Sequence, residues 1–204
     1  MTESLPLPGY GRKVSRSRRL IDPDAIYHTM CRGSDRNPIA WDGQDFRTLT
    51  ELLSRVASRY RWEVFAWCLM PNHYHVVLRT TQGNFSRGFQ VLNQTHSIRT
   101  NRRHGRTAHL FRNRPHCIEV LSDAHLVAAI LYVVRNPIRA GLCRYAWEWP
   151  FSSYRATVGL ASAPDWLAVN AVLELFGGAA EFRRLVHAGQ FVESDTPGAA
   201  LTRE

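Results

Sequence analysis

Two histidines separated by one residue, His73 and His75, begin an apolar segment that predicts a β-strand over residues 73–80. Side chains alternate between the two faces of a strand, so both imidazoles project from one face, about 6.6 Å apart along the strand. Such a pair can chelate one divalent metal ion. The alternative is structural, with one histidine hydrogen-bonded in the core and the other exposed. A closed structural zinc site needs four ligands, usually including cysteine. Because no cysteine adjoins these histidines, an open catalytic site is favoured.

A second candidate pair, Tyr132 and Asn136, belongs to a segment whose periodicity predicts a helix over residues 123–135. We expect Ser122 to cap this helix and Asn136-Pro137 to end it. At 100° per residue, the apolar residues lie on the side of the helix away from Tyr132. They are Leu126, Val127, Ile130, Leu131 and Val134. Tyr132 therefore stands on the polar stripe, where a purely structural tyrosine is the alternative. The i,i+4 spacing also lets the Asn136 amide oxygen reach the same metal ion as the phenol.

Together these residues predict attack of a phenol on a phosphodiester. A phenol is a weak nucleophile at neutral pH, because little of it is ionised. A divalent metal ion and several arginines can stabilise the phenolate, and the metal ion also polarises the phosphoryl oxygen under attack. The product would be a phosphotyrosine ester, which keeps the energy of the broken bond, so that strand rejoining needs no ATP. The chain has no Walker A sequence, in agreement with an ATP-independent reaction.

The charge of the chain is concentrated in one window. The sequence has 26 basic and 17 acidic residues, a net charge of +9, and Lys13 is the only lysine. No acid occurs between Glu63 and Glu119. The basic residues of this window are Arg79, Arg87, Arg99, Arg102, Arg103, Arg106, Arg112 and Arg114. Since solvated surfaces usually mix charges of both signs, the window predicts a surface that binds nucleic-acid phosphates. Chance clustering on a solvated face is the alternative, and a genome rich in G and C would also raise the arginine content.

A second basic run, residues 12–19, lies in a leader rich in Pro, Gly and Ser. We expect residues 1–24 to form a flexible basic arm that follows a nucleic-acid backbone, with Arg16, Arg18 and Arg19 as contacts.

The elements that must position these residues follow the order βαββαβα. The predicted strands cover 25–32, 61–69, 73–80 and 116–121, and the predicted helices cover 43–60, 85–104 and 123–135. This order predicts an α+β fold in which an antiparallel sheet is covered by helices on one side. We expect an aromatic cluster within 145–160 to pack over the core. One or two small helices within 164–192 and a frayed tail at 193–204 would complete the chain.

The sequence resembles the REP-associated tyrosine transposases (RAYTs), a branch of the HUH single-tyrosine, IS200-like transposases. The resemblance covers about residues 25–158 and depends on the shared order and spacing of several segments. They are LMPNHYHVVL (69–78), YVVRNPIRAGL (132–142), AIYH (25–28) with RGSDR (32–36), WPFSSY (149–154), and NRRHG (101–105) with GR (105–106) and LF (110–111). One departure is Tyr74 between the histidines, where the family name specifies a hydrophobic residue. Tyr74 points to the opposite face of the strand, where it can pack.

The resemblance implies a ferredoxin-like HUH palm at residues 25–160, followed by a small helical extension at 161–204. It implies an enzyme that binds single-stranded DNA with a hairpin and cleaves it through a 5′-phosphotyrosine, leaving a free 3′-OH. By position, Tyr132 would be the nucleophile, and His73, His75 and Asn136 the ligands of Mg²⁺ or Mn²⁺.

The expected DNA contacts are arginines of the basic window and of the matched segments. They are Arg99, Arg102, Arg103, Arg106, Arg112, Arg114, Arg32, Arg36 and Arg139, besides the three arginines of the leader. His28, in the first strand, could line the site, but a structural role is the expectation.

Two alternatives share this fold. One is a relaxase or replication nuclease with a different DNA substrate, and the other is a catalytically decayed transposase kept as a DNA-binding regulator. A monomer is expected, with a dimer as the alternative.

The N-terminus lacks the apolar region of a secretory signal, and no apolar stretch is long enough to span a membrane. The four cysteines are widely separated, which favours a reducing compartment. We therefore expect a bacterial cytoplasmic protein without membrane contact, associated with the nucleoid when bound to DNA.

Overall fold

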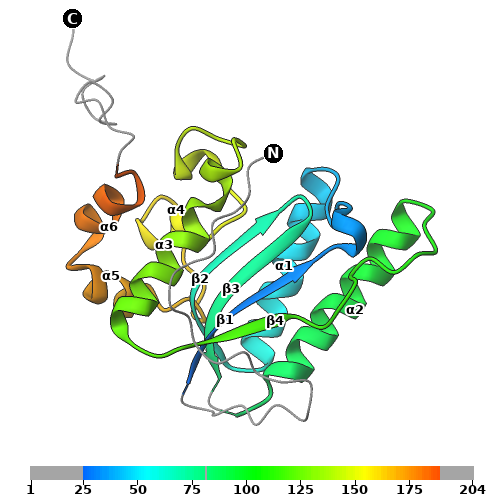
Figure 1. The fold of residues 1–204 in the computed structure, drawn as a ribbon, viewed down its shortest axis with the longest axis horizontal. Helices are drawn as coiled ribbons and strands as arrows, with labels where there is room; N and C mark the ends of the chain where they lie inside the picture. The colour runs from blue at the N-terminus through cyan, green and yellow to red at the C-terminus, as the bar shows by residue number, and fades with distance from the viewer. Residues whose placement is uncertain (1–24, 81, 189–204) are drawn as a thin grey trace, which may run out of the picture.

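The computed structural model of the chain describes residues 25–80 and 82–188 (Figure 1). The predicted arm at residues 1–24 and the predicted tail at 193–204 lie outside these residues. The elements are, in order, β1 (Ile26–Arg32), η1 (Ser34–Arg36), α1 (Gly43–Arg59), β2 (Trp62–Met70), β3 (His73–Thr80), α2 (Phe85–Arg103), β4 (His116–Val120), α3 (Asp123–Arg139), η2 (Ala146–Glu148), α4 (Tyr154–Thr157), α5 (Val169–Phe176) and α6 (Ala179–Val186). The four strands form one antiparallel sheet in the order β2-β3-β1-β4, which confirms the predicted α+β class.

Helices cover both faces of this sheet, so the expectation of cover on one side is wrong. Tyr74, Val76 and Leu78 of β3 belong to a core shared with α1 and α2. The alternate residue Val77 belongs to a second core, shared with α3, α5 and α6. Figure 1 shows α1 and α2 on one side of the sheet and α3 on the other. The strand β2 is buried almost throughout, as a strand with two covered faces must be.

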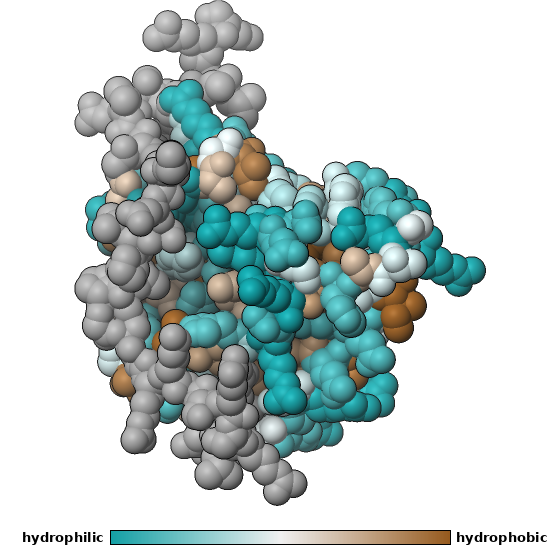
Figure 2. Space-filling view, turned by 45° about the vertical axis from the view of Figure 1, so that its right-hand side comes forward, coloured by the Kyte–Doolittle hydropathy of each residue, from teal (hydrophilic) through white to brown (hydrophobic). Residues whose placement is uncertain are grey.

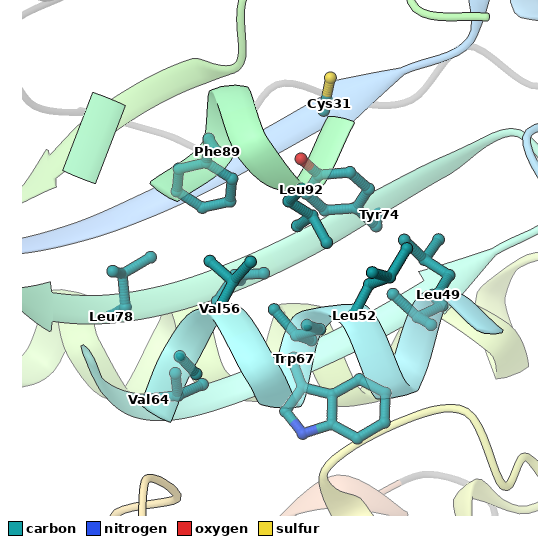
Figure 3. Close-up of a cluster of buried hydrophobic side chains, with 14 of the residues drawn as sticks. Cys31, Leu49, Leu52, Val56, Val64, Trp67, Tyr74, Leu78, Phe89 and Leu92 are labelled. Atoms are coloured by element: carbon teal, nitrogen blue, oxygen red, sulfur yellow. The ribbon is translucent and has the colours of Figure 1, made fainter. Parts of the chain in front are cut away.

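The core beneath α1 and α2 explains the tyrosine between the two histidines. Tyr74 is fully buried among side chains of α1 and α2, such as Leu52 and Leu92 (Figure 3). Its hydroxyl donates a hydrogen bond of 2.7 Å to Oδ1 of Asn93, so its polar atom is satisfied in the core. Tyr74 therefore packs on the face opposite the histidines, as the strand period predicts.

One glycine in α2 is required by a close approach of the sheet. A Cβ added at Gly88 would lie 2.3 Å from Cζ2 of Trp62, a side chain only 2% exposed. The Trp62 ring packs on Phe89 with ring centroids 4.6 Å apart, so it has little room to move. Gly88 is thus the position that lets α2 lie directly on the indole.

We predict that Gly88→Ala destabilises the protein by about 1–3 kcal/mol, because overpacking outweighs the roughly 1 kcal/mol by which alanine favours a helix. Urea unfolding measures the change. Gly43→Ala is the matched control: its Cβ would approach only the flexible end of Arg47, and we expect unchanged or slightly increased stability. Equal stability of both variants would contradict the packing argument.

The helix α3 differs from its prediction at the C-terminal end. It continues through Pro137 to Arg139, so the expectation that Asn136-Pro137 ends it is wrong. A proline has a helix-compatible φ but lacks the N–H that would bond to the carbonyl of Val133, so α3 continues here with one backbone hydrogen bond fewer. The carbonyl of Pro137 accepts from the N–H of Leu142, and the carbonyl of Asn136 accepts from the N–H of Ala140. One additional helical turn therefore follows Asn136.

The segments after α3 cover the outer edge of β2. The predicted aromatic cluster is present: Trp149 donates from Nε1 to the carbonyl of Leu69, and Phe151 stacks on Phe46. Backbone hydrogen bonds join β2 to Ser153 and to Trp166. The helices α5 and α6 then pack beside α3, in the region where small helices were predicted. No helix among the described residues is long and apolar enough to cross a bilayer.

Candidate functional site

The structure brings the two candidate pairs together on the α3 face of the sheet. His73 and His75 stand on this face of β3 with ring centroids 5.0 Å apart. The Tyr132 ring of α3 lies 5.4 Å from the His75 ring, at nearly a right angle. One turn along α3, the side chain of Asn136 lies beside the His73 ring. A phenol, two imidazoles and an amide thus converge from two elements far apart in the sequence.

Local sequence signals set the position of α3. The Ser122 hydroxyl accepts a hydrogen bond from the N–H of His125 and so caps the helix, as predicted. The apolar side of α3 is buried against the sheet through residues such as Ile130 and Val134. Tyr132 is left half-buried, with its ring toward His75 and the guanidinium of Arg139 5.2 Å from its centroid. The helix therefore presents Tyr132 at the boundary between the core and the solvent.

The two histidines of β3 are neutral at pH 7. Burial lowers the pKa of His73 to about 4, with a contribution from the Arg32 charge, while the Asn136 amide, which can accept a hydrogen bond from the protonated ring, opposes this shift. Burial also lowers the pKa of His75 well below its usual range, and His28, His73 and Arg32 add to the effect. Neutral imidazoles have the free lone pair that a metal ligand needs.

Sequence reasoning gave His28 a structural role, but the structure places it in this site. Its Nε2 lies 3.0 Å from Nδ1 of His75, within hydrogen-bonding distance, and its ring centroid is 5.8 Å from that of Tyr132. His28 pairs with Val77 of β3, which places it diagonally across from His75 on the same face. A predicted pairing of β1 with β3 in this register would have indicated the placement, because it puts His28 and His75 on the same face.

The donor set fits a divalent cation. Asn72 Oδ1 lies 2.6 Å from Nδ1 of His73, and Asn136 uses its Nδ2 to donate to the carbonyl of Tyr132, which leaves its amide oxygen for the His73 ring. A neutral imidazole has one N–H and can satisfy only one of these two amide oxygens. A cation shared by His73 and Asn136 would satisfy the second. Among the described residues no group of three or more His, Cys, Asp and Glu side chains could hold a metal ion. The candidate set therefore depends on the Asn136 amide as its third ligand.

A basic groove opens beside this site, at the end of the sheet where β1 ends and β4 begins. It has a volume of about 530 Å³ and is lined by exposed arginines together with Asn113 and His116. The arginines are Arg32, Arg36, Arg112 and Arg114. None of the four forms an ion pair with an acidic residue of the described segments. Arg32 is opposite His73 in the β1–β3 register, so the groove is continuous with the histidine face of the sheet.

The remaining predicted arginines have different surroundings. Arg99 and Arg102 are exposed on α2. Arg103 is bound to the carboxylates of Asp42 and Asp45, so its charge is neutralised within the protein. Arg106 lies over the ring of Trp41 at 5.0 Å. Arg16, Arg18 and Arg19 lie outside the described residues. Figure 2 shows one side of the molecule, largely hydrophilic, with hydrophobic residues in small separate patches.

Comparison with known proteins identifies the family of the chain. The family model described as "Transposase IS200 like" matches residues 23–133, a span that includes both histidines and Tyr132. A curated protein of Haemophilus influenzae, named as a REP-associated tyrosine transposase, is 22% identical over 126 residues, which cover 55% of this chain and 70% of the relative. A solved structure of a REP-associated tyrosine transposase bound to a REP hairpin has the same fold. It aligns with a TM-score of 0.60 at 18% identity, over 74% of this chain and 88% of that one. More than half of the chain thus matches one family model, and the protein belongs to the IS200-like transposase family.

Proposed function

We propose that this protein is a transposase and endonuclease that binds single-stranded DNA next to a hairpin, and that cleaves and rejoins the strand through a phosphotyrosine. The observation that carries the proposal is the 5.4 Å contact between the rings of Tyr132 and His75, with Asn136 one turn away at His73. The relative and the solved structure described above, both REP-associated transposases, support a palindromic hairpin as the substrate class.

In the proposed reaction the Tyr132 oxygen attacks the scissile phosphorus. An O–P bond to Tyr132 forms and the P–O3′ bond breaks, so the 5′ phosphate stays on the protein. The tyrosyl proton passes to water, and the departing 3′ oxygen takes up a proton to leave as a hydroxyl. Attack of a 3′-OH on the phosphotyrosine reverses these steps and rejoins the strand without ATP.

The residues of the site divide this work. His73, His75 and Asn136 would hold a Mg²⁺ or Mn²⁺ ion, which when bound polarises the phosphoryl group and stabilises the charge that develops on it. Tyr132 is oriented by its packing on the His28 and His75 rings. The guanidinium of Arg139 lies over the Tyr132 ring and helps to hold it in place.

The basic groove supplies the path for the DNA backbone. Its four guanidiniums are exposed and unpaired within the described segments, and bidentate phosphate contacts suit arginine. Asp35 and Arg36 in its wall both have positive φ, at 52° and 61°. Strained backbone of this kind is retained where a loop must hold a fixed shape, as a binding loop does.

Covalent capture tests the proposed function. The full-length protein, incubated with Mn²⁺ and an end-labelled oligonucleotide that carries a hairpin and a single-stranded flank, should give a protein–DNA band that survives SDS. Hairpin binding without any adduct, with Mg²⁺ as well as Mn²⁺, would contradict the proposal and favour the decayed regulator. An adduct that forms equally with a flank lacking the hairpin would favour a relaxase-type nuclease.

A second experiment tests the groove. Affinity for single-stranded DNA falls with salt at a slope of about 0.7 per neutralised phosphate. We predict that Arg112→Gln and Arg114→Gln each reduce this slope by about 0.7, measured by fluorescence anisotropy at several salt concentrations. Arg184→Gln is the control, because Arg184 is paired with Glu181 on α6. An unchanged slope in both groove variants would exclude the groove as a phosphate path.

A further inference from the structure

The hydrogen bond between His28 and His75 gives one residue outside the predicted set a defined role. We propose that His28 is a positioning residue: by accepting a hydrogen bond from Nδ1 of His75, it fixes the tautomer and orientation of that ring and leaves the His75 Nε2 lone pair for the ion. This inference rests on the proposed function, in which His75 is a metal ligand.

The pairing admits two proton arrangements. A neutral imidazole has one N–H and one lone pair, so either His75 donates from Nδ1 to Nε2 of His28, or His28 donates in the opposite direction. Only the first arrangement leaves Nε2 of His75 without a proton. The other ring nitrogen of a metal-ligating histidine is usually held by such a partner, which sets the tautomer and the ring orientation.

The second histidine of the strand has a partner of the same kind. Asn72 donates from its Nδ2 to the carbonyl of Arg36, so its Oδ1 is the atom that faces Nδ1 of His73. His73 must then donate from Nδ1, which leaves its Nε2 free. The two histidines thus have the same Nδ1-bonded pattern, one held by an amide oxygen and the other by His28.

The packing of His28 allows little alternative. The side chain is 8% exposed, and its ring lies against both the His75 ring, at 5.1 Å, and the Tyr132 ring, at 5.8 Å. Its strand position between Val77 and Ile118 fixes the direction from which it reaches His75. A substitution at this position therefore removes the acceptor of His75 without changing any of the four predicted site residues.

The tautomer of His75 in the unmodified protein is the first test. Long-range ¹H–¹⁵N correlation spectra of the full-length protein should show His75 protonated on Nδ1. Protonation on Nε2, both without metal and with the diamagnetic ion Mg²⁺ added, would overturn the inference. This readout needs no variant and no DNA.

Mn²⁺ binding in variants is the second test, measured by electron paramagnetic resonance on protein free of DNA. His28→Leu fills a similar volume without an acceptor, and we expect it to weaken Mn²⁺ binding about 10- to 100-fold. His28→Gln keeps an acceptor and should recover most of the affinity. Hairpin affinity without metal should be the same in all three proteins.

The outcomes separate this inference from the proposed function. If the unmodified protein binds Mn²⁺ and forms the DNA adduct, and a folded His28→Leu variant binds Mn²⁺ equally well, the positioning role is wrong while the proposed function stands. If the unmodified protein neither binds Mn²⁺ nor forms an adduct, the proposed function fails.

Discussion

Replacing Tyr132 with phenylalanine is expected to abolish the covalent DNA adduct and to lower strand cleavage by about 10³-fold or more. The change removes one hydroxyl and keeps the ring, so the contacts with His28, His75 and Arg139 should remain. Loss of a nucleophile has effects of this size because no other group takes over the bond-forming step. Denaturing gels with a labelled hairpin oligonucleotide measure both quantities.

The same variant should keep its other properties. Affinity for the hairpin and for Mn²⁺ should stay within about twofold of the original values, because the hydroxyl is removed from a half-buried side chain that lies outside the basic groove. Tyr60→Phe is the matched control, since Tyr60 is also half-buried but stands beside Trp62, at the end of the sheet away from His73. An adduct that persists in Tyr132→Phe would assign the nucleophile to another residue and remove the basis of the proposed mechanism.

The convergence of these residues follows from periods that the sequence displays. The period of two in residues 73–80 puts His73 and His75 on one face and Tyr74 on the other, and β3 has the predicted bounds. The helical period places Tyr132 away from the apolar side of α3. What the periods do not contain is the distance between the two elements, which depends on how α3 crosses the sheet.

The sequence does contain an indication that helices cover both faces of the sheet. Residues 64–70 read Val-Phe-Ala-Trp-Cys-Leu-Met, with no polar residue in alternation. A continuous apolar strand indicates burial on both faces, whereas a strand covered on one face alternates. The strand β2 therefore already required a second layer, which α3 and the C-terminal helices supply.

Long-range charge pairing could not be predicted in the same way. Arg103 was grouped with the DNA contacts because it lies in the acid-free window, yet its partners Asp42 and Asp45 come from the start of α1. The acids and the base are about sixty residues apart, and only the packing of α1 against α2 brings them together. A charge count along the chain reports local composition and contains no information about such neutralisation.

This pairing leads to the largest stability effect that we expect. Asp45 is 3% exposed, and its carboxylate accepts hydrogen bonds from the Trp41 N–H, from Arg103 and from His104. Burial raises the pKa of Asp45, but these three hydrogen bonds outweigh it and hold the pKa below its usual range. Asp45→Ala leaves the partners of a buried carboxylate unpaired, and we expect it to lower the free energy of unfolding by about 3–5 kcal/mol, measured by urea denaturation.

Three further variants test the size of the Asp45 effect and the role of Arg103. Glu181→Ala removes the partner of an exposed ion pair on α6 and should change the free energy of unfolding by less than about 1 kcal/mol. Arg103→Gln should be destabilising and leave the salt dependence of DNA binding unchanged, whereas Arg102→Gln, an exposed neighbour without an ion pair in the described segments, should leave stability unchanged. If Arg103→Gln lowered the salt slope by about 0.7 with no loss of stability, Arg103 would be a DNA contact as the sequence predicts, and its pairing with Asp42 and Asp45 would be energetically minor. A loss of stability with an unchanged salt slope would show that this arginine of the basic window joins α1 to α2 instead of binding phosphate.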